Sequence, residues 1–247
     1  MDQYHQKKQL ERLLVDYFRQ EYPEFPAGKL RESESPDFIL ETNSKYSVGI
    51  ELTRLYPESR LQQTQEDKTK LEAQDKLVRN TQELFEEKSA RKCFCKFLFE
   101  EGSILKPERM LSLSVCLMRL IVESVEQFKP GSTGRILIEK NLPEGIKAVL
   151  VLTHPGLTYS VWEQANNLGI PGNLLDDIRF SIHKKDEKLS LYLKQNLNEY
   201  WLLITTDRLC QQKPVNVTNL LMNSTFNSDY NKVFILELFN RKVFLIK

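Results

Sequence analysis

The stretch SPDFILETNSKYSVGIELT, residues 35–53, decides how the fold is predicted. It holds two runs of alternating apolar residues joined by a short polar segment, which is typical of a β-hairpin with one buried face. The apolar residues of both strands share a face only if paired residue numbers sum to an even value, because a one-residue slip would turn one strand over. A turn at residues 43–45 gives such a register and pairs Phe38 with Ile50.

The same register places two acidic residues, Asp37 and Glu51, opposite each other. Directly opposed strand residues have Cβ atoms about 4.5–5.5 Å apart, and like charges there are destabilising. Solvent, a shared proton, a basic side chain or a divalent cation could offset the repulsion, and a solvated strand face is the simplest of these alternatives. Gly49, on the same face, is expected to leave room for a ligand above the sheet.

The dipeptide PD at residues 36–37, the apolar strand and turn after it, and GIELT at residues 49–53 together resemble the PD-(D/E)xK nuclease superfamily, also called the restriction endonuclease-like fold. The resemblance implies that Asp37, Glu51 and the carbonyl of Leu52 hold Mg²⁺ or Mn²⁺, and oxygen ligands of this kind suit both ions. It also implies an acidic residue from the first helix. Glu11 matches best, with Glu21 behind it.

The chain departs from the superfamily at Thr53, where the motif has a lysine that positions or activates the attacking water. Lys185 is the first candidate to replace it, because it falls on the apolar stripe of a predicted helix; snorkelling of the side chain explains that position equally well. Lys68, near the start of an earlier predicted helix, is the second. The stretch at residues 182–204 also resembles a later part of bacterial domains of this superfamily.

Hydrophobic periodicity and turn residues predict a mixture of helices and strands along the chain. Helices are expected over residues 6–20, 61–88, 107–128 and 174–194, and strands over 93–99, 135–139, 148–152, 200–205, 233–239 and 243–246. No linker or repeat separates them, so we expect a single domain over residues 1–247. The predicted class is α/β, with a central mixed sheet flanked by helices, a restriction endonuclease-like core and a C-terminal strand hairpin.

Composition limits the classes of function only loosely. The 247 residues are 40% hydrophobic and 28% charged, as expected of a globular protein, and the net charge of +1 excludes a strong global basic field. The N-terminus is polar and no apolar run approaches the roughly 20 residues that span a membrane, so a cytoplasmic protein without a membrane partner is expected. Cys93 and Cys95 are expected to be reduced thiols on one face of a strand.

The predicted activity is metal-dependent hydrolysis of phosphodiester bonds in nucleic acid, with DNA favoured over RNA as the partner. The alternative is a catalytically inactive member of the same fold that binds protein or nucleic acid, which Thr53 and the near-neutral charge favour. A homodimer is left open.

Overall fold

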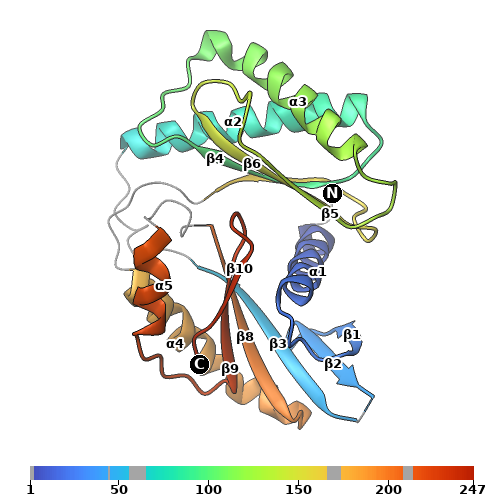
Figure 1. Ribbon diagram of the computed structural model, residues 1–247, viewed down its shortest axis with the longest axis vertical. Helices are drawn as coiled ribbons and strands as arrows, with labels where there is room; N and C mark the ends of the chain where they lie inside the picture. The colour runs from blue at the N-terminus through green and yellow to red at the C-terminus, as the bar shows by residue number, and fades with distance from the viewer. Residues whose placement is uncertain (1–2, 44, 56–64, 166–173, 208–213) are drawn as a thin grey trace. The chain divides into compact units, whose positions relative to one another are not determined.

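The chain forms two compact units, which Figure 1 shows in a computed structural model of the protein. The first comprises Met1–Leu13 and Gln62–Gly169, and the second comprises Leu14–Leu61 and Ile170–Lys247. Helix α1 (Gln3–Glu21) contributes to both. The structure describes residues 3–43, 45–55, 65–165, 174–207 and 214–247. The predicted single domain therefore contains two units, each with its own sheet.

The first unit is a four-stranded sheet in the order β5-β6-β4-β7, with two helices packed on one face. Its strands are β4 (Phe94–Phe99), β5 (Gly134–Ile138), β6 (Ile146–Thr153) and β7 (Val161–Gln164). The helices are α2 (Gln65–Lys88) and α3 (Met110–Glu126), the latter preceded by a 3₁₀ turn at Pro107–Arg109. Strand β7 lies in a region for which the sequence analysis predicted neither a helix nor a strand.

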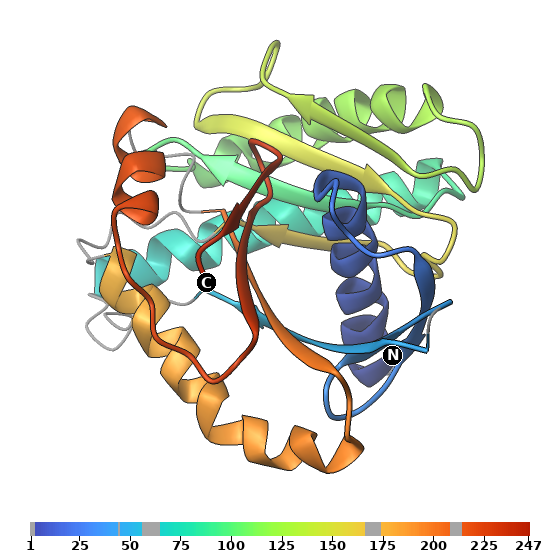
Figure 2. The same cartoon turned by 60° about the horizontal axis from the view of Figure 1, so that its bottom comes forward.

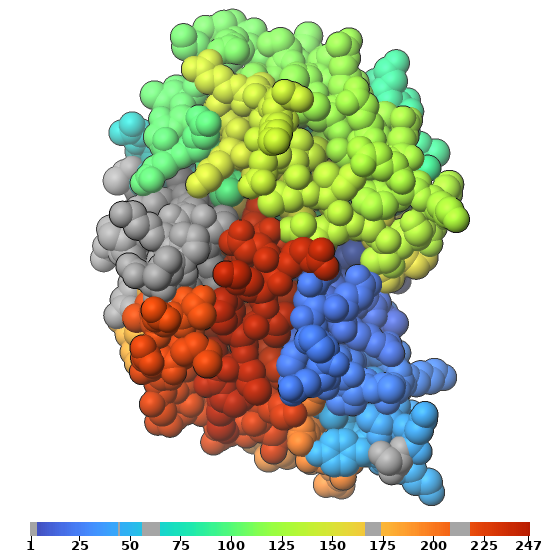
Figure 3. Space-filling model, viewed as in Figure 1, coloured from blue at the N-terminus to red at the C-terminus, as the bar shows by residue number. Residues whose placement is uncertain are grey.

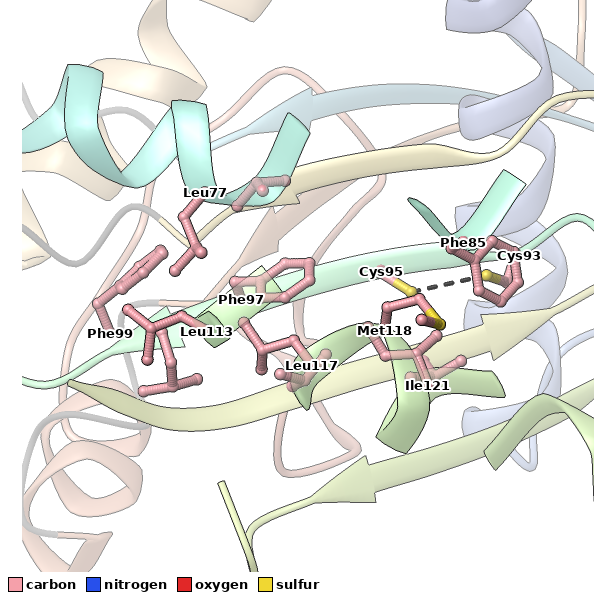
Figure 4. Packing of buried hydrophobic residues seen from close by; sticks show 14 of the residues in the cluster. Leu77, Phe85, Cys93, Cys95, Phe97, Phe99, Leu113, Leu117, Met118 and Ile121 are labelled. Carbon is pink, nitrogen blue, oxygen red and sulfur yellow. Dashed lines mark hydrogen bonds between the residues drawn. The ribbon is translucent and has the colours of Figure 1, made fainter. Parts of the chain in front are cut away.

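Alternate residues of β4 face the two helices and form the core of the first unit (Figure 4). Phe97 and Phe99 meet Leu113 and Leu117 of α3 there, because every second strand residue points to the same face. The sulfurs of Cys93 and Cys95 are 3.6 Å apart and fully buried among these residues. The expectation that they share one face of a strand is confirmed.

The second unit contains a six-stranded mixed sheet in the order β1-β2-β3-β8-β9-β10. Its strands are β1 (Gly28–Glu32), β2 (Phe38–Thr42), β3 (Ser47–Arg54), β8 (Glu199–Thr206), β9 (Lys232–Glu237) and β10 (Lys242–Leu245). Strands β3, β8 and β9 run parallel, and the outer pairs are antiparallel. The predicted α/β class with a mixed sheet flanked by helices is therefore confirmed, as is the C-terminal hairpin, part of which reaches the surface in Figure 3.

Helices cover both faces of this sheet, as Figure 2 shows for α1 and α4 (Leu174–Tyr192). The α4 face has an aliphatic core that includes Ile182 and Leu202. On the opposite face the ring of Phe18 lies 4.9 Å from that of Phe234, between ring centres. The shorter α5 (Pro214–Met222), which the sequence analysis did not predict, follows β8.

Candidate active site

The hairpin of β2 and β3 has the register that its apolar pattern predicts. Phe38 is paired with Ile50 and Leu40 with Val48, so the prediction is confirmed. Asp37 precedes β2 directly and is 8% exposed, and Glu51 is 4% exposed. Both acidic residues are thus buried, Asp37 directly before β2 and Glu51 on the adjacent β3, rather than on a solvated strand face.

Asp37 is held at the end of the ladder between the two strands. Its Oδ2 atom accepts a hydrogen bond of 2.8 Å from the backbone N–H of Leu52. Leu52 lies two residues beyond Ile50, the last β3 residue that is paired with β2. Beyond the last backbone pair of the two strands, the Asp37 carboxylate accepts the N–H of Leu52 in place of a backbone carbonyl. This hydrogen bond fixes Asp37 against β3.

Glu51 points from β3 toward α4, where two donors share one of its oxygens. The Lys185 ammonium lies 2.6 Å from Glu51 Oε1, and the Tyr192 hydroxyl donates to the same atom at 2.9 Å. Lys185 and Tyr192 are seven residues apart on the helix, a spacing of two turns that places them on one face. The sequence analysis proposed Lys185 but missed Tyr192, although the same spacing indicates it.

The Tyr192 hydroxyl is a neutral donor in this site. Burial, followed by the charge of Glu51, raises the pKa of Tyr192 well above its usual value. Its backbone carbonyl accepts a hydrogen bond of 2.9 Å from the Tyr200 hydroxyl. Tyr192 is therefore fixed at both ends, and it holds the Glu51 carboxylate in one orientation.

The open space that was expected above Gly49 is filled by other side chains. A Cβ atom at this position would lie 2.7 Å from Pro36 Cγ, 2.9 Å from Leu197 Cδ1 and 3.1 Å from Tyr200 Cδ1. Glycine is needed here because neighbouring side chains approach the backbone of β3 closely, and the expectation of a ligand above it is wrong.

Three other predicted residues have different neighbours or belong to the first unit. Glu11 and Lys68 belong to the first unit, where Glu11 is paired with Lys7 at 3.3 Å and Lys68 is exposed on α2. Glu21 is paired with Arg241, at 2.8 Å. Within the second unit the cluster therefore consists of Asp37, Glu51 and Leu52 with the donors from α4.

A cationic pocket of about 170 Å³ opens beside Lys185, between the end of β3 and one face of α4. Four of its described lining residues are cationic and none is acidic. The lining residues are Thr53, Arg54, Phe180, Ser181, Lys184, Lys185 and Lys188. Lys185 therefore contacts the buried Glu51 and also lines a pocket with positive charge.

The carboxylate oxygens of Asp37 and Glu51 are of the type that a hard divalent cation prefers. No group of three or more His, Cys, Asp or Glu side chains that could hold a metal occurs among the residues that the structure describes. Mg²⁺ is usually held by one or two carboxylates and keeps several waters. Asp37 and Glu51 are two carboxylates of this kind.

Comparisons of the chain with protein-family models, with curated proteins and with solved structures found no match. None of the helices in the described ranges combines the length and the apolar character needed to cross a membrane.

Proposed function

We propose that the protein hydrolyses phosphodiester bonds of nucleic acid with the help of a divalent cation, at a site built around Asp37 and Glu51. One observation supports the proposal: the buried Glu51 carboxylate lies 2.6 Å from the Lys185 ammonium, and the buried Asp37 carboxylate accepts a hydrogen bond from Leu52, the residue that follows Glu51. A bound Mg²⁺ or Mn²⁺ supplies positive charge to the phosphoryl oxygens and to the attacking water.

The residues of the chain have distinct roles in this proposal. Asp37, Glu51 and the Leu52 carbonyl would hold the ion, and Tyr192 orients the Glu51 carboxylate. Lys185 supplies the positive charge that the superfamily places at the position of Thr53. An ammonium group next to the scissile phosphate stabilises the negative charge that develops there in the transition state.

Cleavage assays with isosteric variants test the proposal. Asp37→Asn and Glu51→Gln retain hydrogen-bond acceptors but remove the charge that binds a cation, so each should reduce Mg²⁺-dependent cleavage of linear and supercoiled DNA by at least about 10²-fold. Glu32→Gln is the matched control, because Glu32 is an exposed carboxylate on β1. Equal activity of all four proteins, or activity that persists without divalent ions, would contradict the proposal.

A second candidate is binding without catalysis. The Lys185 ammonium already compensates the charge of Glu51, the Tyr192 hydroxyl donates to the same oxygen, and the motif lysine is replaced by Thr53. A protein of this kind would bind nucleic acid in the presence of EDTA and would show no cleavage with either Mg²⁺ or Mn²⁺.

The proposal includes DNA rather than RNA as the partner and the cytoplasm as the location. Competition between DNA and RNA of one sequence tests the first, and cell fractionation tests the second. A homodimer is tested by measuring the molecular mass in solution over a range of protein concentrations.

A further inference from the structure

The cationic pocket beside Lys185 is smaller than a site for a whole ligand. Its volume of about 170 Å³ is below the roughly 300–1,000 Å³ of pockets that enclose small-molecule ligands. It can therefore hold one part of a larger molecule, and its cationic side chains favour a part that carries negative charge.

The pocket also presents an aromatic ring at the surface. The side chain of Phe180 is 43% exposed, although its neighbours Ile178 and Ile182 on α4 are buried. The Lys184 ammonium lies 6.0 Å from the centre of the Phe180 ring. An exposed ring beside several cations is the combination with which proteins bind single-stranded nucleic acid, because the ring stacks on a base and the cations contact phosphates.

We infer that this pocket binds one unpaired nucleotide next to the scissile phosphate, with its base on Phe180 and its phosphate contacted by Lys184 and Lys188. The inference rests on the proposed function, whose substrate class it narrows to single-stranded nucleic acid or to the unpaired end of a duplex. A base inside a duplex is already stacked on both sides, so it cannot stack on Phe180 in this way.

Binding measured without divalent cations separates this inference from catalysis. The probes are a fluorescein-labelled single-stranded oligodeoxynucleotide, a blunt hairpin duplex whose stem contains that sequence and whose loop is a polyethylene glycol linker without bases, and the corresponding single-stranded RNA, each followed by anisotropy in EDTA. The single strand should bind more tightly than the hairpin. The RNA probe shows whether the sugar matters, because the base and phosphate contacts are common to both nucleic acids.

Variants of the ring test the stacking. Phe180→Leu keeps an apolar side chain and should weaken binding of the single strand by about tenfold while leaving the hairpin unchanged. Phe180→Trp should restore binding, a result that a merely structural role for the ring does not predict. Lys184→Ala and Lys188→Ala should each reduce the slope of log affinity against log salt by about 0.7 for the single strand.

The possible results bear on the two proposals separately. Equal affinity for the single strand and the hairpin, or no effect of Phe180→Leu, would overturn the inference about the pocket, and cleavage by the parent protein would still support hydrolysis. Single-strand binding that depends on Phe180, without cleavage in Mg²⁺ or Mn²⁺, would support the pocket and overturn the hydrolytic function.

Discussion

The Lys185 ammonium lies 2.6 Å from Glu51 Oε1, although 134 residues separate the two in the sequence. The side chain of Lys185 is 18% exposed and that of Glu51 is 6% exposed. Removing one partner of a buried pair leaves the other charge without compensation, which is strongly destabilising. A substitution in this pair should therefore change the stability of the second unit as well as the activity proposed for the site.

Lys185→Met should lower the free energy of unfolding by about 2–3 kcal/mol, toward the low end for buried pairs because Tyr192 still donates to Glu51. Adding Glu51→Gln should recover a large part of that loss, because the double variant contains neither charge. Urea denaturation of the parent, both single variants and the double variant measures the coupling. Lys242→Met, an exposed change on β10, is the control and should cost less than about 0.5 kcal/mol. Additive losses would show that the pair contributes no coupling energy.

Mg²⁺ should stabilise the Lys185→Met variant more than the parent protein. In the parent the ammonium competes with the cation for the charge of Glu51, and in the variant that competitor is absent. Thermal melts with and without about 10 mM Mg²⁺ at neutral pH measure the difference, since a ligand that binds only the folded state raises its stability. The stabilisation should decrease at acidic pH, where protons compete for the carboxylates. Asp37→Asn is expected to abolish it, and an unchanged melting temperature in every protein would contradict a metal site.

Alkaline pH should destabilise the folded protein partly through Tyr192. Burial and the charge of Glu51 raise the pKa of Tyr192 in the folded state above the unfolded value of about 10. As the pH rises above 10 the unfolded chain releases this proton first, so it binds fewer protons than the folded chain and stability falls. Tyr192→Phe removes that contribution, and its free energy of unfolding should fall less between pH 9 and pH 11 than that of the parent. Urea denaturation in EDTA measures both slopes, and identical slopes would contradict the prediction.

The sequence predicts the hairpin and its register well. Two alternating strands with one shared buried face allow only those registers in which the paired residue numbers sum to an even value. It also identifies Lys185 as a candidate, since a lysine on an otherwise apolar helical stripe either extends to solvent or contacts a polar group, and in the fold it contacts Glu51. Strand β1 is missed because GKLRE contains a single buried apolar residue, Leu30, and β7 is missed because its sequence, VWEQ, has no alternation of apolar and polar residues. These are weak local signals that the neighbouring strands reinforce in the folded protein.

The division into two units could not be predicted from the same patterns. The second unit is assembled from residues on both sides of the first, and no linker composition marks the crossings. The sequence does not predict the cationic pocket either. Its residues Arg54, at the end of a strand, and Lys184 and Lys188, on a helix, are far apart in the sequence. Such a site depends on tertiary packing, which local periodicity does not encode.

The last prediction concerns the displaced lysine. Thr53 lies two residues after Glu51 on β3, so both side chains point to the same face of the sheet, and Thr53 lines the same pocket as Lys185. A lysine at position 53 would therefore place an ammonium group in the same pocket to which Lys185 now supplies positive charge.

If Lys185 provides the catalytic charge, Lys185→Met should lower cleavage by roughly 10²-fold, as other losses of transition-state charge stabilisation do. Adding Thr53→Lys to that variant should recover at least about tenfold, and Thr53→Met, which is similar in length but uncharged, should recover nothing. Single-turnover cleavage assays at saturating Mg²⁺ compare the four proteins, and urea denaturation of each one separates lost stability from lost chemistry. Full cleavage by Lys185→Met, or equal rescue by Thr53→Lys and Thr53→Met, would show that Lys185 does not replace the motif lysine.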